Sequence, residues 1–387
     1  MESSTQWYLG LVCFVNMACV GTMYALSILQ AELSRLLGVG QHMSFAPFAT
    51  ASLGLSVGVA TAASQISSIG ACAVTARGTM VWGLAVLATG HFLAMLNYWG
   101  ILASLLLGGV GVGWTYLAVV LLVSQAFPNN AVARSAVGPL GFSSGTAACI
   151  VGSVLLNFSF LSASSLGGVL QGLGVTFFAI GLATAAVSPS KTRQSDAPVQ
   201  KTRNVRQLFY CAFLFLNALP GMVAFSALIP VALYQQNEAP HSPLILLSYA
   251  MSALAAGGVL GPPLSSWLGA DQTFGLLFCL RGLLLIAWAC SSSLVLALAS
   301  LIAVLFGHGT GFSTLPGLIK SELGEPERFP TVYGQILMTW GFAGVAASTI
   351  NGLLLSASGN GTNVALILGA AMLPIGAITP FIKLGRK

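Results

Sequence analysis

The most constraining feature of this sequence is a succession of apolar stretches, each close to 20 residues or longer, with few polar breaks between them. A helix of about 20 apolar residues crosses the hydrocarbon core of a bilayer, which is about 30 Å thick. Charged residues form only 6% of the chain, whereas a soluble domain carries about 25%. Transmembrane barrel strands are about 10 residues long and strictly alternating, unlike these stretches. The sequence therefore predicts an all-α integral membrane protein surrounded by the lipid bilayer.

We expect twelve transmembrane helices, arranged as two sets of six. The first set covers residues 7–29, 43–66, 71–95, 98–125, 132–157 and 166–187. The second set covers residues 207–234, 243–268, 273–291, 293–318, 330–357 and 362–382. The predicted domains are an N-terminal six-helix bundle over 1–187, a cytoplasmic linker loop over 188–206 and a C-terminal six-helix bundle over 207–387.

The basic residues give the expected orientation, because cytoplasmic loops of membrane proteins are rich in Lys and Arg. With both termini in the cytoplasm, Arg35 lies outside and Arg281 lies within a helix, which leaves 12 of the 14 basic residues inside. One missed helix would move about half of these residues to the other side. The distribution therefore supports both the helix count and the orientation, in a plasma membrane or an inner membrane.

Composition and motifs exclude several classes of function. The net charge of +6 comes from 14 Lys and Arg against 8 Asp and Glu, and no basic run is long enough to follow a nucleic-acid backbone. Residues 54–58 and 141–145 match GxSxG, but the strand-to-helix elbow that the motif requires is not expected here. No Cys or His cluster has metal-ligand spacing. We expect no enzyme, no cofactor, no metal and no nucleic-acid partner.

The two halves of the sequence repeat. Residues 109–113 read GVGVG and residues 307–311 read GHGTG, an offset of 198. A Gly-Phe pair at 141–142 returns at 341–342, an offset of 200. A parallel repeat of six helices about an axis along the membrane normal is how major facilitator transporters are built. The repeat therefore favours that architecture.

Two segments also resemble one branch of that superfamily. Leu107–Val151, with Phe127-Pro128, Arg134 and the glycines from Gly138 to Gly145, resembles the helix 4–5 signature of the oxalate/formate antiporter-like and monocarboxylate-transporter-like facilitators. Gly307–Val345 resembles their helix 10–11 signature. The resemblance implies a central cavity lined by helices 1, 4, 7 and 10, with helices 2, 5, 8 and 11 beside them. It also implies a small carboxylate as the substrate.

The sequence departs from this branch in its basic residues. The oxalate transporter of the branch uses cationic side chains in helices 8 and 11. Here neither Leu244–Leu268 nor Thr331–Ser356 contains Arg or Lys. Oxalate itself is therefore not the expected substrate.

Two cationic or titratable side chains fall inside predicted helices, where such groups need a physical reason. His308 interrupts the glycine run of helix 10, where a substrate or a neighbouring helix can approach closely. It is either a hydrogen-bonded packing histidine or a partner for a carboxylate. Arg281 in helix 9 either extends to the inner headgroups, bonds to carbonyls of a neighbouring helix, or contacts an anion.

Aromatic and amide side chains on the expected cavity helices complete the candidate substrate site. Tryptophans could enclose a small anion while Tyr and His donate hydrogen bonds, although each such residue alone also suits packing or an interfacial position. The predicted substrate-binding residues are His308, Tyr24, Trp114, Tyr116, Asn217, Gln335, Trp340 and Arg281.

The sequence thus predicts a monomeric transporter of a small organic anion, a mono- or dicarboxylate, that works by alternating access. No Asp or Glu lies at the centre of a predicted helix, so exchange or facilitated diffusion fits better than proton coupling through a buried carboxylate. The alternative is a facilitator-fold receptor or sensor that does not transport.

Overall fold

The computed structural model describes residues 3–128, 130–156, 161–187, 205–224, 242–291, 293–323, 326–358, 361–382 and 384. Within these ranges the chain is helical and contains no strand, as the sequence predicted. Most of the expected 188–206 linker and part of the seventh predicted span lie outside the described residues. The domain division at that linker stays a prediction.

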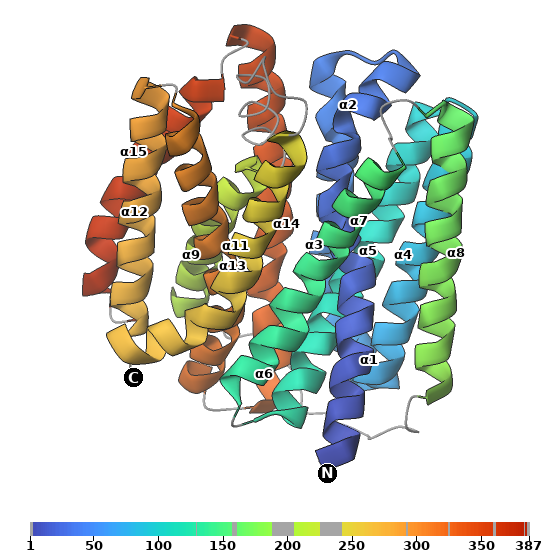
Figure 1. Ribbon diagram of the computed structural model, residues 1–387. Coiled ribbons are helices and arrows are strands. Elements are labelled where there is room, and N and C mark those ends of the chain that lie inside the picture. The colour runs from blue at the N-terminus through green and yellow to red at the C-terminus, as the bar shows by residue number, and fades with distance from the viewer. Residues whose placement is uncertain are drawn as a thin grey trace.

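The first half of the described chain forms a bundle of helices with three short irregular segments, η1 (Thr22–Ala25), η2 (Gln41–Phe45) and η3 (Ala136–Leu140) (Figure 1). Its helices are α1 (Ser3–Gly21), α2 (Leu26–Leu37), α3 (Ala46–Ile69), α4 (Ala71–Ala94), α5 (Tyr98–Ala126), α6 (Ala131–Ser135), α7 (Gly141–Leu155) and α8 (Ala163–Val187). α4 packs against α5 and α8, α3 against α5, and α1 against α5 and α7.

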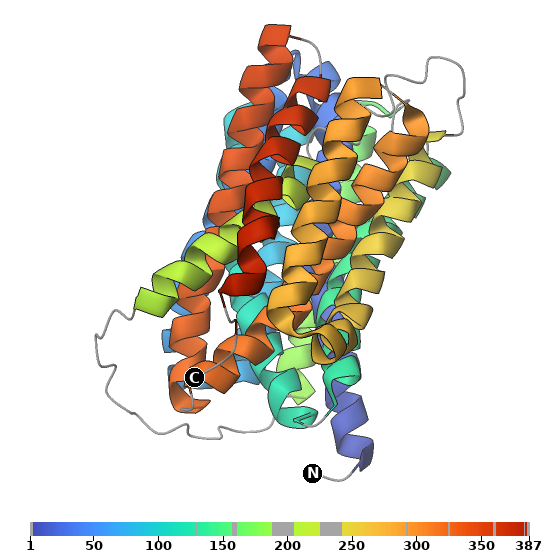
Figure 2. The same ribbon diagram turned by 90° about the vertical axis from the view of Figure 1, so that its left-hand side faces the viewer.

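The second half forms a similar bundle, which faces the viewer in Figure 2. Its helices are α9 (Val205–Val223), α11 (Ser242–Leu268), α12 (Ala270–Ser291), α13 (Leu294–Leu323), α14 (Phe329–Ser358) and α15 (Gly361–Ile378). α11 packs against α13, α12 against α13 and α15, and α14 against α9. The two halves meet where α3 packs on α14 and α7 on α11.

The helices agree with the predicted membrane spans. Among the described residues, nine helices are long and apolar enough to cross a bilayer. The other three predicted spans correspond to α7, α9 and α11, each of which is helical over the part described. The protein is a multi-pass integral membrane protein. The first helical rod is longer than predicted, because α2 continues it to Leu37 instead of ending near residue 29.

Two of these rods contain an irregular segment at the same level of the bundle. The α1–α2 rod tightens into a 3-10 turn, η1, over Thr22–Ala25. α6 and α7 are joined by a π-helical segment, η3, over Ala136–Leu140, which contains Pro139. A proline lacks the amide hydrogen needed for a regular helical bond, which accounts for the widened turn. Both segments contribute residues to the site described below.

Glycines let α1 and α7 approach backbone to backbone. A Cβ atom at Gly21 would lie 1.9 Å from the Phe142 carbonyl oxygen, and one at Gly145 would lie 1.8 Å from that of Ala18. Both distances are far below van der Waals contact, so any side chain at either position would push the helices apart. This contact places η1 directly beside the start of α7.

The basic residues are distributed unequally between the two ends of the bundle. α1 begins and α15 ends at the same end of the bundle (Figure 1). Arg77 at the start of α4, Arg134 in α6 and Lys320 near the end of α13 lie at this end, and Arg35 near the end of α2 lies at the opposite end. The positive-inside rule assigns the first end to the cytoplasm. That assignment stays a prediction.

Candidate functional site

An aromatic cluster closes the space between the two halves near the middle of the bundle. It encloses a small cavity of about 20 Å³, which has room for about one water molecule. The cluster is defined by six side chains from η1, α5, α7, α13 and α14. These are Tyr24, Tyr116, Phe142, His308, Phe312 and Trp340.

Hydrogen bonds within this aromatic cluster join residues that are 284 and 316 positions apart in the sequence. The Tyr24 hydroxyl lies 2.9 Å from Nε2 of His308 and accepts a hydrogen bond of 3.0 Å from Nε1 of Trp340. Tyr24 comes from the first half, and the other two come from the second half. The hydroxyl therefore joins the halves through two buried hydrogen bonds.

Ring contacts complete the seal. Trp340 lies at the centre, with its ring centroid 4.9 Å from that of Tyr116, 5.6 Å from Phe142 and 4.8 Å from Phe312. The rings meet at steep angles, the edge-to-face arrangement that aromatic pairs prefer. With all six side chains buried, the aromatic cluster blocks the passage between the halves.

A larger cavity, here called the vestibule, lies on one side of this cluster. Its volume is about 600 Å³, within the range of small-molecule sites. Tyr116, Pro139 and Phe312 line both the vestibule and the small central cavity, so the vestibule ends at the aromatic cluster. Arg134 and Lys320 line it at the end of the bundle where α1 begins.

The charged residues of the vestibule come from both halves. Arg134 belongs to the first half and Lys320 to the second, and among the described residues of the lining Asp271 is the one acidic residue. The Arg134 guanidinium donates a 2.8 Å hydrogen bond to the Phe127 carbonyl oxygen. The described lining therefore carries a formal excess of one positive charge.

Arg281 lies inside the second half and is fully buried. Its Nη2 donates to Oδ1 of Asn217 at 3.0 Å, and its Nε donates to the Leu277 carbonyl oxygen at 3.1 Å. The guanidinium also lies 4.5 Å from the centroid of the Phe278 ring. The hypothesis that Arg281 extends to the headgroups is wrong, because these bonds and the packing hold it in the helix bundle. The alternative, bonds to a neighbouring helix, is what the structure shows.

Glycines make the room for these polar side chains. A Cβ at Gly307 would lie 2.7 Å from Cζ of Arg281, and one at Gly221 would lie 2.2 Å from Nδ1 of His308. A Cβ at Gly311 would lie 1.9 Å from Nδ2 of Asn217. The glycine run of α13 thus holds Arg281 and Asn217 directly behind the helix turn that presents His308 to the aromatic cluster.

The structure divides the eight predicted site residues into three groups. Tyr24, Tyr116, His308 and Trp340 meet in the aromatic cluster, and Asn217 and Arg281 meet behind His308. Trp114 and Gln335 lie elsewhere. Trp114 donates to the Thr61 hydroxyl on α3 at 2.9 Å, and Gln335 contacts Gln207 at an exposed contact of α14 with α9.

Sequence reasoning missed two aromatic members of the site. Phe312 follows His308 by four residues, which puts both on one helix face. Phe142 belongs to the repeated Gly-Phe pair, yet its partner in the repeat, Phe342, is 45% exposed. The spacing to His308 could have identified Phe312, whereas the repeat alone does not distinguish Phe142 from Phe342.

Comparisons with known proteins identify the fold. No family model matches the sequence, and no curated protein matches it either. Among solved structures, the chain is similar to a variant of the E. coli fucose:proton symporter FucP. The sequence identity is 15% and the TM-score is 0.68, and the alignment covers 96% of this chain and 98% of that one. It is also similar to a bacterial homologue of the iron transporter ferroportin in an outward-facing state, with 14% identity, a TM-score of 0.69 and the same coverage.

A further structure of FucP, described as a major facilitator superfamily transporter in the outward conformation, covers 96% of this chain with a TM-score of 0.68 at 15% identity. The chain therefore has the major facilitator fold, as the sequence repeat predicted. At these identities the similarity concerns the fold. The predicted resemblance to the oxalate/formate and monocarboxylate branch stays a prediction.

Proposed function

We propose that this protein is a secondary transporter that moves a small organic anion, a mono- or dicarboxylate, across the membrane by alternating access. One observation carries the proposal: a vestibule of about 600 Å³ runs between the two halves and ends at a buried aromatic cluster that joins them. A cavity that is accessible from one end and blocked at the centre is what one state of an alternating-access cycle requires.

The closure can be reversed at modest cost. The Tyr24 hydroxyl makes hydrogen bonds with His308 and Trp340, and each such bond contributes about 1 kcal/mol net. The ring contacts of the aromatic cluster are between faces and edges, which can separate without leaving an unpaired charge. The fold resembles transporters solved in outward-facing states, whereas the vestibule here opens at the end predicted to be cytoplasmic.

The charge of the vestibule supports an anionic substrate. Arg134 and Lys320 line it from opposite halves, against the single acid Asp271, and such an arrangement attracts anions into a cleft. His308 lies at the inner end of the vestibule, and Arg281 and Asn217 lie behind His308. When the aromatic cluster opens, His308 and Tyr24 are the groups placed to donate hydrogen bonds to a carboxylate.

A counterflow screen tests this proposal. The purified protein is reconstituted in proteoliposomes that contain an excess of one unlabelled solute, and uptake of the same labelled solute is followed for a series of mono- and dicarboxylates and for a neutral sugar. Saturable counterflow of a carboxylate, and not of the sugar, is the expected result. Counterflow of the sugar alone would overturn the choice of an anion. Specific binding without flux of any solute would favour the receptor or sensor.

A pair of variants links the flux to the vestibule. Lys320→Gln removes a positive charge from the vestibule lining, and Arg77→Gln removes one from the same end of the bundle at a position outside that lining. We expect Lys320→Gln to lower the apparent affinity for the anion, with a difference that shrinks at high salt because mobile ions screen exposed charges. Arg77→Gln should leave the affinity unchanged.

A further inference from the structure

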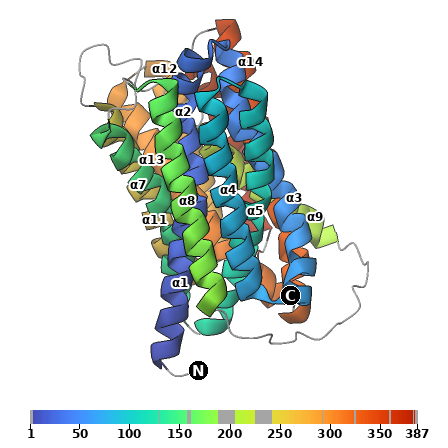
Figure 3. The ribbon, with the colours of Figure 1, turned by 90° about the vertical axis from the view of Figure 1, so that its right-hand side faces the viewer.

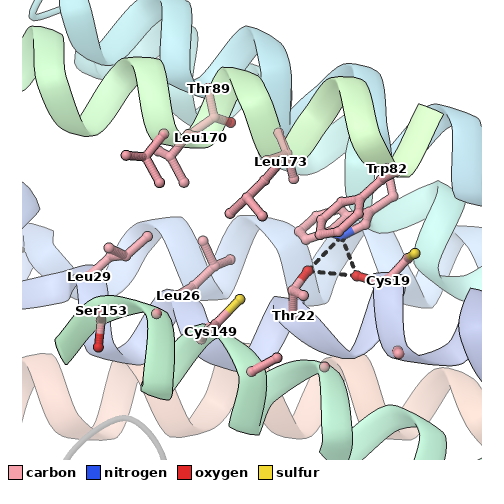
Figure 4. Close-up of a pocket in the computed structure, with 18 of the residues that line it drawn as sticks. Cys19, Thr22, Leu26, Leu29, Trp82, Thr89, Cys149, Ser153, Leu170 and Leu173 are labelled. Carbon is pink, nitrogen blue, oxygen red and sulfur yellow. Dashed lines mark hydrogen bonds between the residues drawn. The ribbon is translucent and has the colours of Figure 1, made fainter. Parts of the chain in front are cut away.

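A second, apolar groove lies within the first half, separate from the vestibule. Its volume is about 380 Å³, and its lining comes from α1, η1, α2, α4, α5, α7 and α8. Figure 3 faces this side of the molecule, where α8 lies in front of the rod formed by α1 and α2. The rod formed by α1, η1 and α2 is the floor of the groove, and the other helices form its walls (Figure 4).

Most polar groups along this groove already make hydrogen bonds within the protein. Nε1 of Trp82 donates to the Cys19 carbonyl oxygen and to the Thr22 hydroxyl, both at 3.0 Å, and that hydroxyl donates to the same carbonyl at 2.6 Å (Figure 4). The Ser153 hydroxyl donates to the Ile150 carbonyl oxygen at 2.7 Å. Within the described lining, the Thr89 hydroxyl is an exception, because its oxygen is buried without a hydrogen-bond partner. The groove therefore suits hydrocarbon and not a polar molecule.

The groove is continuous with the surface that these helices present to the bilayer. Val151 and Leu156 beside it at the end of α7, and Val175 on α8, are exposed apolar side chains on segments that belong to a membrane protein. Apolar space without partner atoms loses dispersion contacts along its whole lining. In a bilayer, the molecules that can supply those contacts are lipids.

The groove is long enough to hold an extended acyl chain. Its lining follows the α1–η1–α2 rod from Phe14 to Leu33, which is about 28 Å of helix at 1.5 Å per residue. Arg35 lies just beyond the Leu33 end, where its guanidinium bonds to Glu32 at 2.9 Å and to the Leu161 carbonyl oxygen at 3.2 Å. A guanidinium has five N–H donors, so donors remain for a phosphate group at this end.

We propose that this groove binds one acyl chain of a membrane phospholipid, which enters from the bilayer between α7 and α8 and has its phosphate at the Arg35 end. The acyl chain fills the space that is bounded by α7, α8 and α1. It also contacts η1, the segment that carries Tyr24 to the aromatic cluster. The site is independent of the proposed transport function.

Photolabelling tests this proposal directly. The protein is reconstituted with phosphatidylcholine that carries a photoactivatable group either near the glycerol or at the end of one acyl chain, and labelled peptides are identified by mass spectrometry. We expect the first probe to label the Leu29–Leu33 end of the groove and the second to label the Phe14–Cys19 end. Equal labelling of all exposed helix faces, or the same pattern from both probes, would overturn the proposal.

Two glycines provide a matched pair of variants. Gly152 on α7 lines the groove, Gly172 on α8 does not, and a Cβ at either position would meet no atom within 4 Å. Gly152→Phe should fill the groove and reduce its labelling to background, and Gly172→Phe should leave it unchanged. Unchanged labelling in Gly152→Phe, or an equal loss in both variants, would contradict an acyl-chain site. If Gly152→Phe does not fold, Val169→Trp fills the groove from the opposite wall and gives the same comparison.

Discussion

Replacing Tyr24 with Phe removes the hydroxyl that joins the two halves and keeps the ring. The ring still packs against Phe142, whose centroid lies 5.0 Å away, so the change isolates the hydrogen bonds to His308 and Trp340. Two bonds at about 1 kcal/mol each make the closed state about 2 kcal/mol less favourable relative to the open one. At 1.4 kcal/mol per factor of ten, the open population rises about 30-fold.

Cysteine accessibility measures this shift without knowledge of the substrate. Leu254 lines the closed central cavity and is buried. A cysteine at this position, in a variant lacking the seven native cysteines, is treated with a membrane-impermeant thiol reagent added from the side opposite the vestibule. Because the reagent reaches it only in the open state, Tyr24→Phe should raise the labelling rate by about 30-fold while opening remains rare.

Tyr98→Phe is the matched control. It also removes a tyrosine hydroxyl that makes a hydrogen bond, here of 2.8 Å to the Met43 carbonyl oxygen, but both residues belong to the first half. Its labelling rate should equal that of the parent. The reasoning is refuted if Tyr24→Phe is well folded and labels at the parent rate, because the two bonds would then contribute nothing to closure.

Three further predictions concern the site and the topology. If His308 donates to a carboxylate, His308→Ala should weaken substrate affinity in counterflow by about 10- to 150-fold, which is the range for a charge-assisted hydrogen bond. His308→Gln should lose less affinity. Normal affinity in well-expressed His308→Ala would remove His308 from the site. Arg281→Met leaves Oδ1 of Asn217 without its hydrogen bond and should lower the free energy of unfolding by about 1–3 kcal/mol, as measured by thermal denaturation. Adding Asn217→Leu should restore this stability but not transport. Restored transport would show that the charge of Arg281 is not used. A cysteine at Ser162 should label from outside and one at Ser195, in the predicted linker, should not; outside labelling of the latter reverses the orientation.

The helices themselves could be predicted from the sequence because an apolar run of fixed length is a strong constraint. The breaks within them could not. η1 at Thr22–Ala25 contains neither Gly nor Pro, so no residue marks the change of helix type. Pro139 does mark the π-helical segment η3. The α1–α2 rod continues beyond its predicted end through the ion pair of Glu32 and Arg35 at 2.9 Å, because a search for apolar runs stops at charged residues whereas a helix does not.

Rotation about the helix axis explains which predicted site residues lie away from the aromatic cluster. A membrane helix is apolar on its lipid face and on its core face, so periodicity does not show which face is inward. Geometry could still have helped. Trp114 precedes Tyr116 by two residues, about 200° around the helix, and Gln335 precedes Trp340 by five, about 140°. Neither pair can face one cavity, and in each case the structure places the second member in the aromatic cluster.

The placement of Arg281 shows how one repeat can serve two purposes. In the first half, the glycines of the GVGVG run admit backbone: a Cβ at Gly109 would lie 2.1 Å from the Ala51 carbonyl oxygen on α3. In the second half, Gly307 and Gly311 of the GHGTG run instead admit the side chains of Arg281 and Asn217.

A buried cation in a membrane protein is costly unless other groups solvate it, and here carbonyl and amide oxygens do so. Among the described residues, no carboxylate forms a salt bridge with Arg281, so no described carboxylate neutralises its charge. The second half therefore keeps a positive centre behind His308, which the matching positions of the first half lack. An anion that enters between the halves would be drawn to the second half, and the first half would supply the tyrosines and the aromatic wall that close over it.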